Sequence, residues 1–261
     1  MRFPHIRSRC FMFGKNRCSS YILRSRPGRR QTVRPGPFAM SKQFQRETVE
    51  KFPKILYNNR YYPLMQQEKK NTKGAIMKIV FVRHGEPDKT YVDKKGFIGL
   101  GRDLAPLTDL GIAQAKEASH SPLLQGGQII VSSPYTRALY TAAIISKNTG
   151  LDILVEVDLH EFFPDKTFMV KGEEENSMLH RDFIKCMGEY PKGETRRWET
   201  IPEIIERTKP IMDRYYDLGY EKIIVVAHGG VIRRYTGIGV IEYGGVLEME
   251  YDKDFECYGW L

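Results

Sequence analysis

The stretch "IVFVRHGE", Ile79 to Glu86, passes from four apolar residues directly into a polar turn that begins with Arg83 and His84. A second stretch, "IIVVAHGG", Ile223 to Gly230, repeats this arrangement around His228. Short apolar runs of this kind are typical of buried strands in a parallel sheet. Parallel sheets bind ligands beyond the carboxyl ends of their strands, so we predict that both histidines lie at one site.

Short apolar runs alternate with helical patterns over residues 77–261, and this alternation predicts an α/β fold. We expect a three-layer α/β/α sandwich with a mostly parallel central sheet. Residues 245–252, "GVLEMEYD", alternate apolar and polar side chains and are expected at an edge of the sheet. Residues 164–194 are expected to form a cap insertion. The other expected strands are Lys78 to Val82, Gln128 to Ser133, Ile153 to Val157 and Lys222 to Ala227.

Several helix ends can be predicted from single residues. Thr108 is a plausible N-cap for the helix that follows it, and Gly150 is suited to end a helix that starts near Thr136. A capping box begins at Thr200, and Pro210 is expected to kink or break the helix that starts there. In the insertion, the spacing of Leu179, Phe183, Cys186 and Met187 predicts a helix that packs on the domain and roofs the site. A helix that binds a partner is the alternative.

The net charge of +9 is unevenly distributed along the 261 residues. Residues 1–40 contribute +10 and residues 41–76 contribute +5, which leaves −6 for residues 77–261. The basic composition therefore belongs to the first 76 residues, and the remainder gives no electrostatic reason to expect binding to nucleic acid or to an anionic membrane. No apolar run approaches the roughly 18 residues that a membrane helix needs.

The basic segment 1–76 has several possible interpretations, and we expect it to be disordered. Its Arg-rich, acid-free start is typical of a mitochondrial transit peptide, and a nucleic-acid-binding arm is another possibility. A further hypothesis is that it is translated upstream sequence, because codons for Lys73 to Ala75 can spell a ribosome-binding sequence just before Met77. We expect a cytoplasmic protein, or a mitochondrial one if the segment is a genuine transit peptide.

The cysteines indicate neither a disulfide framework nor a zinc site. Cys186 and Cys257 stand alone within residues 77–261, and the chain contains no CxxC pair. No acidic cluster in the sequence is suited to Mg²⁺ either. We therefore predict that the protein uses no metal and no cofactor.

Two further side chains follow predicted strands. Arg137 falls in the first turn of a helix, where a cation is unfavourable unless an anion is bound nearby; pairing with a surface acid is the alternative. Glu161 precedes Phe162 and Phe163, and an apolar environment would favour its protonated form, making it a candidate proton donor. A solvated loop acid is the alternative for Glu161, and His160 competes with it as the donor.

Five short motifs in this order resemble the histidine phosphatase superfamily, also called the phosphoglycerate mutase-like family. They extend from Met77 to about Ile238 and read "VRHGE", "LTDLGIAQA", "SSPYTRALYTA", "LHE" and "VVAHGGVIRR". The resemblance implies that His84 is the nucleophile and forms a phosphohistidine. It also implies that Glu161 protonates the leaving oxygen and that the phosphoryl group is held by Arg83, Arg137 and His228.

These implied roles agree with elementary chemistry. A neutral imidazole is a nucleophile near pH 7, and two guanidinium groups match phosphoryl oxygens in charge and geometry. Backbone N–H groups at Gly229, where a helix is expected to start, would point at an anion. The resemblance thus predicts a phosphomonoesterase that acts on a small phosphate ester.

Two other activities stay open on the sequence. A mutase would return the phosphoryl group to a hydroxyl, and Thr195 to Thr200, "TRRWET", could supply cations for a substrate carboxylate, although a solvated turn is the simpler interpretation. A non-catalytic phospho-ligand binder would keep the arginines alone. The "FFPDKTFMVKGEEENS" stretch after Glu161 departs from better-known members of the family, in which this region helps to cover the pocket, so the departure bears on substrate choice; Asp165 is the next acid along. The sequence predicts no oligomeric state.

Overall fold

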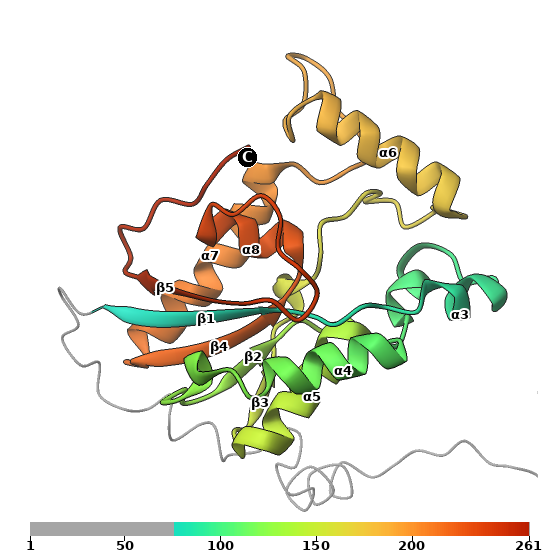
Figure 1. Cartoon of the computed structure of the whole chain (residues 1–261). Helices are drawn as coiled ribbons and strands as arrows, with labels where there is room; N and C mark the ends of the chain where they lie inside the picture. Colours follow the sequence, from blue (N-terminus) through green and yellow to red (C-terminus); the bar gives the residue numbers. More distant parts are fainter. Residues whose placement is uncertain (1–75, 261) are drawn as a thin grey trace, which may run out of the picture. The chain divides into compact units, whose positions relative to one another are not determined.

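The central sheet has five strands in the order β3-β2-β4-β1-β5. The computed structural model describes residues 76–260 (Figure 1). The strands β1 (Met77–Arg83), β4 (Lys222–Ala227), β2 (Ile130–Ser132) and β3 (Ile153–Val155) pair in parallel, and β5 (Val246–Tyr251) pairs antiparallel with β1 at the edge. The mostly parallel sheet and its edge strand are as predicted. β2 and β3 are shorter than predicted, because only three residues of each pair with a neighbour.

The register between β1 and β4 positions the two histidines. Ile79 pairs with Ile223, and Arg83 pairs with Ala227. His84 and His228 each come directly after their strand, so they emerge next to each other at the same edge of the sheet. All the residues of β1 and β4 except Lys78, Arg83 and Lys222 are buried, which explains the continuous apolar runs.

Helices cover both faces of the sheet. On one face α5 (Thr136–Thr149) contributes Ala138, Ala142 and Ile145 to an apolar cluster with Val80 and Val82. On the other face α7 (Ile201–Asp217) and α8 (Gly229–Thr236) pack on residues of β1, β2 and β4 (Figure 1). The predicted three-layer α/β/α sandwich is confirmed.

The predicted helix ends are found where the sequence placed them. Thr108 caps α4 (Asp109–Ala118) by accepting a hydrogen bond from the Gly111 N–H, and α5 ends at Gly150 with a φ of 74°. Thr200 and Glu203 form the capping box of α7. These ends depend on neighbours in the chain, which is why they could be recognised in the sequence.

The prediction of a break at Pro210 is wrong, because α7 continues through it to Asp217. A proline in a helix removes the hydrogen bond to the carbonyl group four residues earlier. Pro210 and Glu206 both lie on the exposed side of α7, so that carbonyl group can bond to water instead. The cost of the missing bond is thereby reduced.

Short elements and one longer helix complete the described structure. They are α3 (Lys89–Lys94), η1 (Gly99–Leu104), η2 (Pro122–Leu124), η3 (Val157–Leu159) and α6 (Glu173–Lys185). In Figure 1 both α3 and α6 lie beyond the carboxyl end of β1. Within residues 76–260, the helices are all too short or too polar to cross a membrane. The predictions about residues 1–75 fall outside the described residues.

Candidate active site

His84 is buried, and its two ring nitrogens have different partners. Nδ1 lies 2.7 Å from the carbonyl oxygen of Gly85, and Nε2 lies 3.2 Å from Nε of Arg137. A carbonyl oxygen only accepts and a guanidinium only donates, so the proton is on Nδ1 and the lone pair is on Nε2. Burial, with the positive charge of Arg137, holds the pKa of His84 well below its usual range. His84 is therefore a neutral imidazole whose Nε2 is free of a proton.

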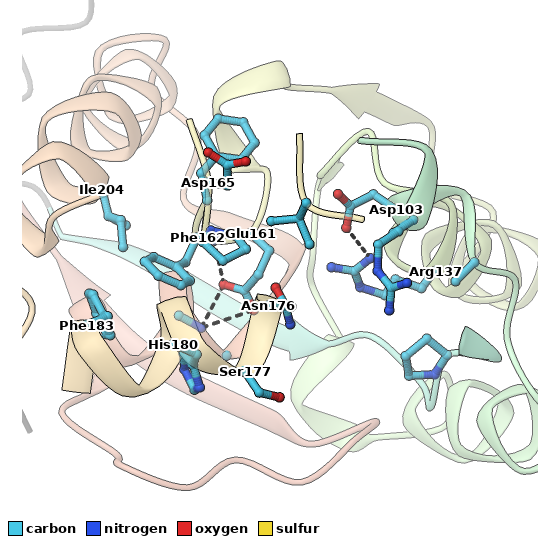
Figure 2. Close-up of a pocket in the computed structure, with 18 of the residues that line it drawn as sticks. Asp103, Arg137, Glu161, Phe162, Asp165, Asn176, Ser177, His180, Phe183 and Ile204 are labelled. Carbon is cyan, nitrogen blue, oxygen red and sulfur yellow. Dashed lines mark hydrogen bonds and ion pairs between the residues drawn. The ribbon is translucent and has the colours of Figure 1, made fainter. Parts of the chain in front are cut away.

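Arg137 is held from two sides in the first turn of α5. Its Nε donates to His84, and its Nη1 donates to Oδ1 of Asp103 at 2.9 Å (Figure 2). Burial raises the pKa of Asp103, and the charge of Arg137 opposes that effect. Arg137 thus pairs with an acid, as the alternative interpretation predicted, but the acid lies in the site rather than on the surface.

Arg83 lies over the ring of Tyr243, with 4.0 Å between its Cζ and the ring centroid. Its Nη1 donates to the carbonyl oxygen of Ile241, while its Nε is buried with no hydrogen-bond partner. Gly229 lies beside it, because a Cβ added there would be 3.8 Å from the Arg83 Nε. The guanidinium therefore has donor capacity left for a ligand.

His228 is completely buried and does not line the cavity described below. Its Nε2 lies 2.7 Å from Oγ of Ser133, and its Nδ1 has no partner. Its ring centroid lies 5.0 Å from that of His84. Burial, with the charge of Arg137, holds the pKa of His228 well below its usual range.

Glu161 lies at the amino end of α8. Its Oε1 accepts hydrogen bonds from the N–H groups of Phe162 at 2.9 Å and Gly230 at 3.1 Å. Its Oε2 is 3.5 Å from the same Gly230 nitrogen and is the less engaged oxygen. A Cβ at Gly230 would be 2.3 Å from Glu161 Oε1, so a side chain there would displace the carboxylate. The α8 amino end thus holds Glu161 in place.

A cavity of about 620 Å³ opens at this edge of the sheet. Five of the predicted site residues line this cavity: Arg83, His84, Arg137, Glu161 and Gly229. His160, the competing proton donor, does not line it and stacks on Phe163, with 3.9 Å between the ring centroids. The structure therefore brings the predicted residues together around one cavity, with His228 behind its wall.

The helix α6 forms one side of the cavity, but with a different face from the one predicted. Its lining residues are Glu173, Asn176, Ser177, His180, Phe183 and Ile184, several of which appear in Figure 2. Of the predicted roofing residues only Phe183 is among them, and Met187 lies beyond the helix with 61% exposure. The wall is more polar than predicted, because Glu173, Asn176, Ser177 and His180 form most of it. No residue of α6 is buried.

The "TRRWET" segment holds the insertion together, so neither predicted role for it is correct. Arg197 donates to both carboxylate oxygens of Asp165, at 3.0 and 2.6 Å, and also pairs with Glu175 of α6. These hydrogen bonds hold the pKa of Asp165 well below its usual range, so Asp165 stays ionised. Arg196 pairs with Asp182 and Glu194. The segment is not a solvated turn either, because Trp198 is completely buried.

Several cavity residues are not distinguished by the sequence. Asp103 lies in η1, and Arg233 follows the second histidine by five positions in α8. "VVAHGGVIRR" contains Arg233, but nothing local distinguishes it from a solvated helical arginine. No group of three His, Cys, Asp or Glu side chains in residues 76–260 has an arrangement suited to a metal ion.

Comparison with known sequences identifies relatives of the chain. A sequence model of the histidine phosphatase superfamily (branch 1) matches residues 79–238. The protein named "Putative phosphoserine phosphatase 2" of Hydrogenobacter thermophilus is 31% identical over 203 residues, covering 70% of this chain and 95% of that protein. "Bifunctional protein Rv2228c" of Mycobacterium tuberculosis is 26% identical over 182 residues, covering 67% of this chain but only 47% of that protein.

Solved structures support the same fold. One described as mycobacterial hydrolase 1 gives a TM-score of 0.54 at 18% identity, covering 70% of this chain and 96% of that one. The structure of the mycobacterial glucosyl-3-phosphoglycerate phosphatase Rv2419c gives a TM-score of 0.53 at 19% identity, covering 67% of this chain and 90% of that one. Together with the match over residues 79–238, these findings show that the chain belongs to branch 1 of the histidine phosphatase superfamily.

Proposed function

We propose that the protein is a metal-independent phosphomonoesterase that forms a phosphohistidine on Nε2 of His84 and acts on a small phosphorylated metabolite. The observation that carries this proposal is the state of His84: Nδ1 keeps the proton at the Gly85 carbonyl, while Nε2 faces Arg137 at the cavity. A nucleophilic imidazole needs this tautomer and a neighbouring cation that can bind the phosphoryl oxygens.

In the first step, the lone pair of His84 Nε2 attacks phosphorus and the P–O bond to the alcohol breaks. The leaving oxygen takes a proton from Glu161, so an alcohol departs and a phosphohistidine remains. Oε1 of Glu161 accepts from two backbone N–H groups, so Oε2 is the oxygen that would carry the proton.

In the second step, water attacks phosphorus and gives a proton to the Glu161 carboxylate. The P–N bond breaks, inorganic phosphate leaves, and His84 is again neutral. The same carboxyl group thus acts first as acid and then as base, which returns the site to its starting state.

The phosphoryl oxygens would be bound by Arg83, Arg137, His228 and the Gly229 N–H. Arg83 has an unused buried Nε, and the Nε of Arg137 can move from His84 Nε2 to an oxygen once that lone pair forms the P–N bond. Nδ1 of His228 has no partner and can donate to a phosphoryl oxygen when the ring proton is on that nitrogen. Arg83 and the Gly229 N–H are in place before the reaction, so they stabilise developing charge with little reorganisation.

The test is hydrolysis of p-nitrophenyl phosphate in excess EDTA, with His84→Ala in parallel. We expect metal-independent turnover and an acid-labile phosphoenzyme in the wild-type protein, and neither in the variant. Turnover retained by His84→Ala would refute the nucleophile, and transfer to glycerate phosphates in place of water would identify a mutase. Phosphoserine is the first natural ester to test, given the name of the Hydrogenobacter relative.

A further inference from the structure

Six cationic side chains line the cavity, and their partners can be compared. Arg137 pairs with Asp103, Arg102 with Asp93 and Glu173, and Lys89 lies 3.9 Å from Glu173. The remaining three are arginines: Arg83 donates to the Ile241 carbonyl, Arg234 to the Tyr258 and Gly259 carbonyls, and Arg233 has no partner. Within residues 76–260, Arg233 is the one cavity cation that neither an acid nor a carbonyl group engages.

Arg233 lines a cavity whose acids are engaged by other groups. Its Nε is buried without a hydrogen-bond partner, which is costly for a charged group. Glu161 is held by backbone N–H groups, Asp165 by Arg197, and Glu173 by Arg102. A guanidinium in this situation is suited to an anion supplied by a ligand.

The position of Arg233 sets where that anion would lie. It follows Gly230 by three residues in α8, roughly 5 Å along the helix axis and so one turn beyond the amide that holds Glu161. Figure 2 shows His180 and Phe183 of α6 beside Glu161 and Phe162. Because Glu161 is the proposed donor to the leaving oxygen, Arg233 lies on the alcohol side of the scissile bond.

We propose that Arg233 binds a second anionic group, a carboxylate or a phosphate, on the leaving alcohol of the substrate. The substrate class is then a phosphate ester of a short alcohol that carries its own acid. This inference rests on the proposed phosphatase function and adds the recognition of the leaving group. The proposed phosphoryl site at Arg83 and Arg137 would be the same for substrates with and without the second acid.

The test compares ligands that differ in one acid. O-phospho-L-serine and O-phosphoethanolamine differ by a carboxylate, and propane-1,3-diol bisphosphate and propyl phosphate differ by a terminal phosphate. Each is measured as a competitor of p-nitrophenyl phosphate hydrolysis. We expect the wild-type protein to prefer the acid-bearing member of at least one pair, and Arg233→Gln to reduce that preference on the order of 10- to 100-fold, as for loss of a charge-assisted hydrogen bond.

Two more variants separate charge recognition from structural damage. Arg233→Lys keeps the charge and should restore part of the preference, while Arg181→Gln removes a charge from an exposed position on α6 that does not line the cavity and should leave the preference as in the wild-type protein. The pair that responds identifies the second acid as carboxylate or phosphate.

Equal affinity for both members of each pair, or the same preference in the wild-type protein and Arg233→Gln, would overturn the inference. Absence of p-nitrophenyl phosphate hydrolysis in the wild-type protein would instead count against the proposed function. The two failures are therefore distinguishable.

Discussion

His84 and His228 follow similar strands, yet their surroundings give them different capacities. His84 lines the cavity and points Nε2 at Arg137, whereas His228 is completely buried and engages Ser133 through Nε2. Of these two histidines, only His84 therefore presents an unprotonated nitrogen to the cavity. The difference arises from the side chains on α5 and in the turn before it, which neither histidine motif contains.

At the same scale, Glu161→Gln should test the proton donor. Glutamine keeps the shape and can still accept from the N–H groups of Phe162 and Gly230, but it has no proton to give at the leaving oxygen. We expect kcat for alkyl phosphates to fall by roughly 10² to 10⁴ and kcat for p-nitrophenyl phosphate to fall less, since a phenolate leaves without protonation. Steady-state kinetics with both ester types measures this.

Equal losses for aryl and alkyl esters would mean that another group is the acid. Asp165 is a poor replacement because Arg197 keeps it ionised, and His160 stacks on Phe163 outside the cavity lining. Asp103 also lines the cavity, but its Oδ1 accepts from Arg137, so Glu161 with its less engaged Oε2 remains the proposed donor.

At the scale of elements, ion pairs and aromatic contacts together attach α6 to the loop after Glu161, where Phe183 packs on Phe162 with 4.4 Å between the ring centroids. Arg197 joins Asp165, whose side chain is 2% exposed, to Glu175 at the start of α6. Trp198 is buried beside this pair and its Nε1 donates to Asp182 of α6. Since α6 has no buried residues, these contacts fix the wall of the cavity.

Asp165→Asn should therefore destabilise the protein at neutral pH, by about 1–3 kcal/mol in the free energy of unfolding, as expected for loss of a hydrogen-bonded charge. The pKa of Asp165 is depressed in the folded state, so its contribution is present above the unfolded pKa of about 4 and is lost as the pH falls below it. Denaturant unfolding at neutral pH and near pH 3 should show the wild-type advantage shrinking with acid.

The matched control for this prediction is Asp217→Asn. Asp217 pairs with Lys253, and both side chains are about half exposed, so its loss should change the free energy of unfolding little. An Asp165→Asn protein as stable as the wild type at neutral pH would contradict the structural role of the Asp165–Arg197 pair.

At the scale of the whole molecule, the domain is predicted to be self-sufficient from Met77 onward. Met77 is the first residue of β1 and is 1% exposed, and the sheet, both apolar clusters and the cavity are formed within residues 76–260. A chain that starts at Met77 should fold and hydrolyse p-nitrophenyl phosphate with the same kcat/KM as the full chain, because a domain with its own core folds alone.

Circular dichroism and steady-state kinetics of the two chains measure this, with His84→Ala in the short chain as the control for contaminating phosphatase. A short chain that fails to fold or loses activity would show that residues 1–76 belong to the working protein. The basic segment would then contribute to the folding or the activity of the domain.

The sequence by itself determined the sheet, its edge strand, the helix caps at Thr108, Gly150 and Thr200, and the family, including its phosphatase activity. These properties are readable because they depend on periodicity and on residues close together in the chain. The motifs also predicted five residues that line the cavity, since parallel strands end at one edge: Arg83, His84, Arg137, Glu161 and Gly229.

Only the tertiary structure decided which of those side chains are free to act. In the folded chain Arg137 pairs with Asp103 and Arg197 pairs with Asp165. A polar face of α6 lines the cavity, and Arg233 has no acid as a partner. Each outcome depends on contacts between segments tens of residues apart, and local sequence does not encode such contacts. The partner of a charged side chain, and hence its availability to a substrate, is fixed only when the distant segments pack together.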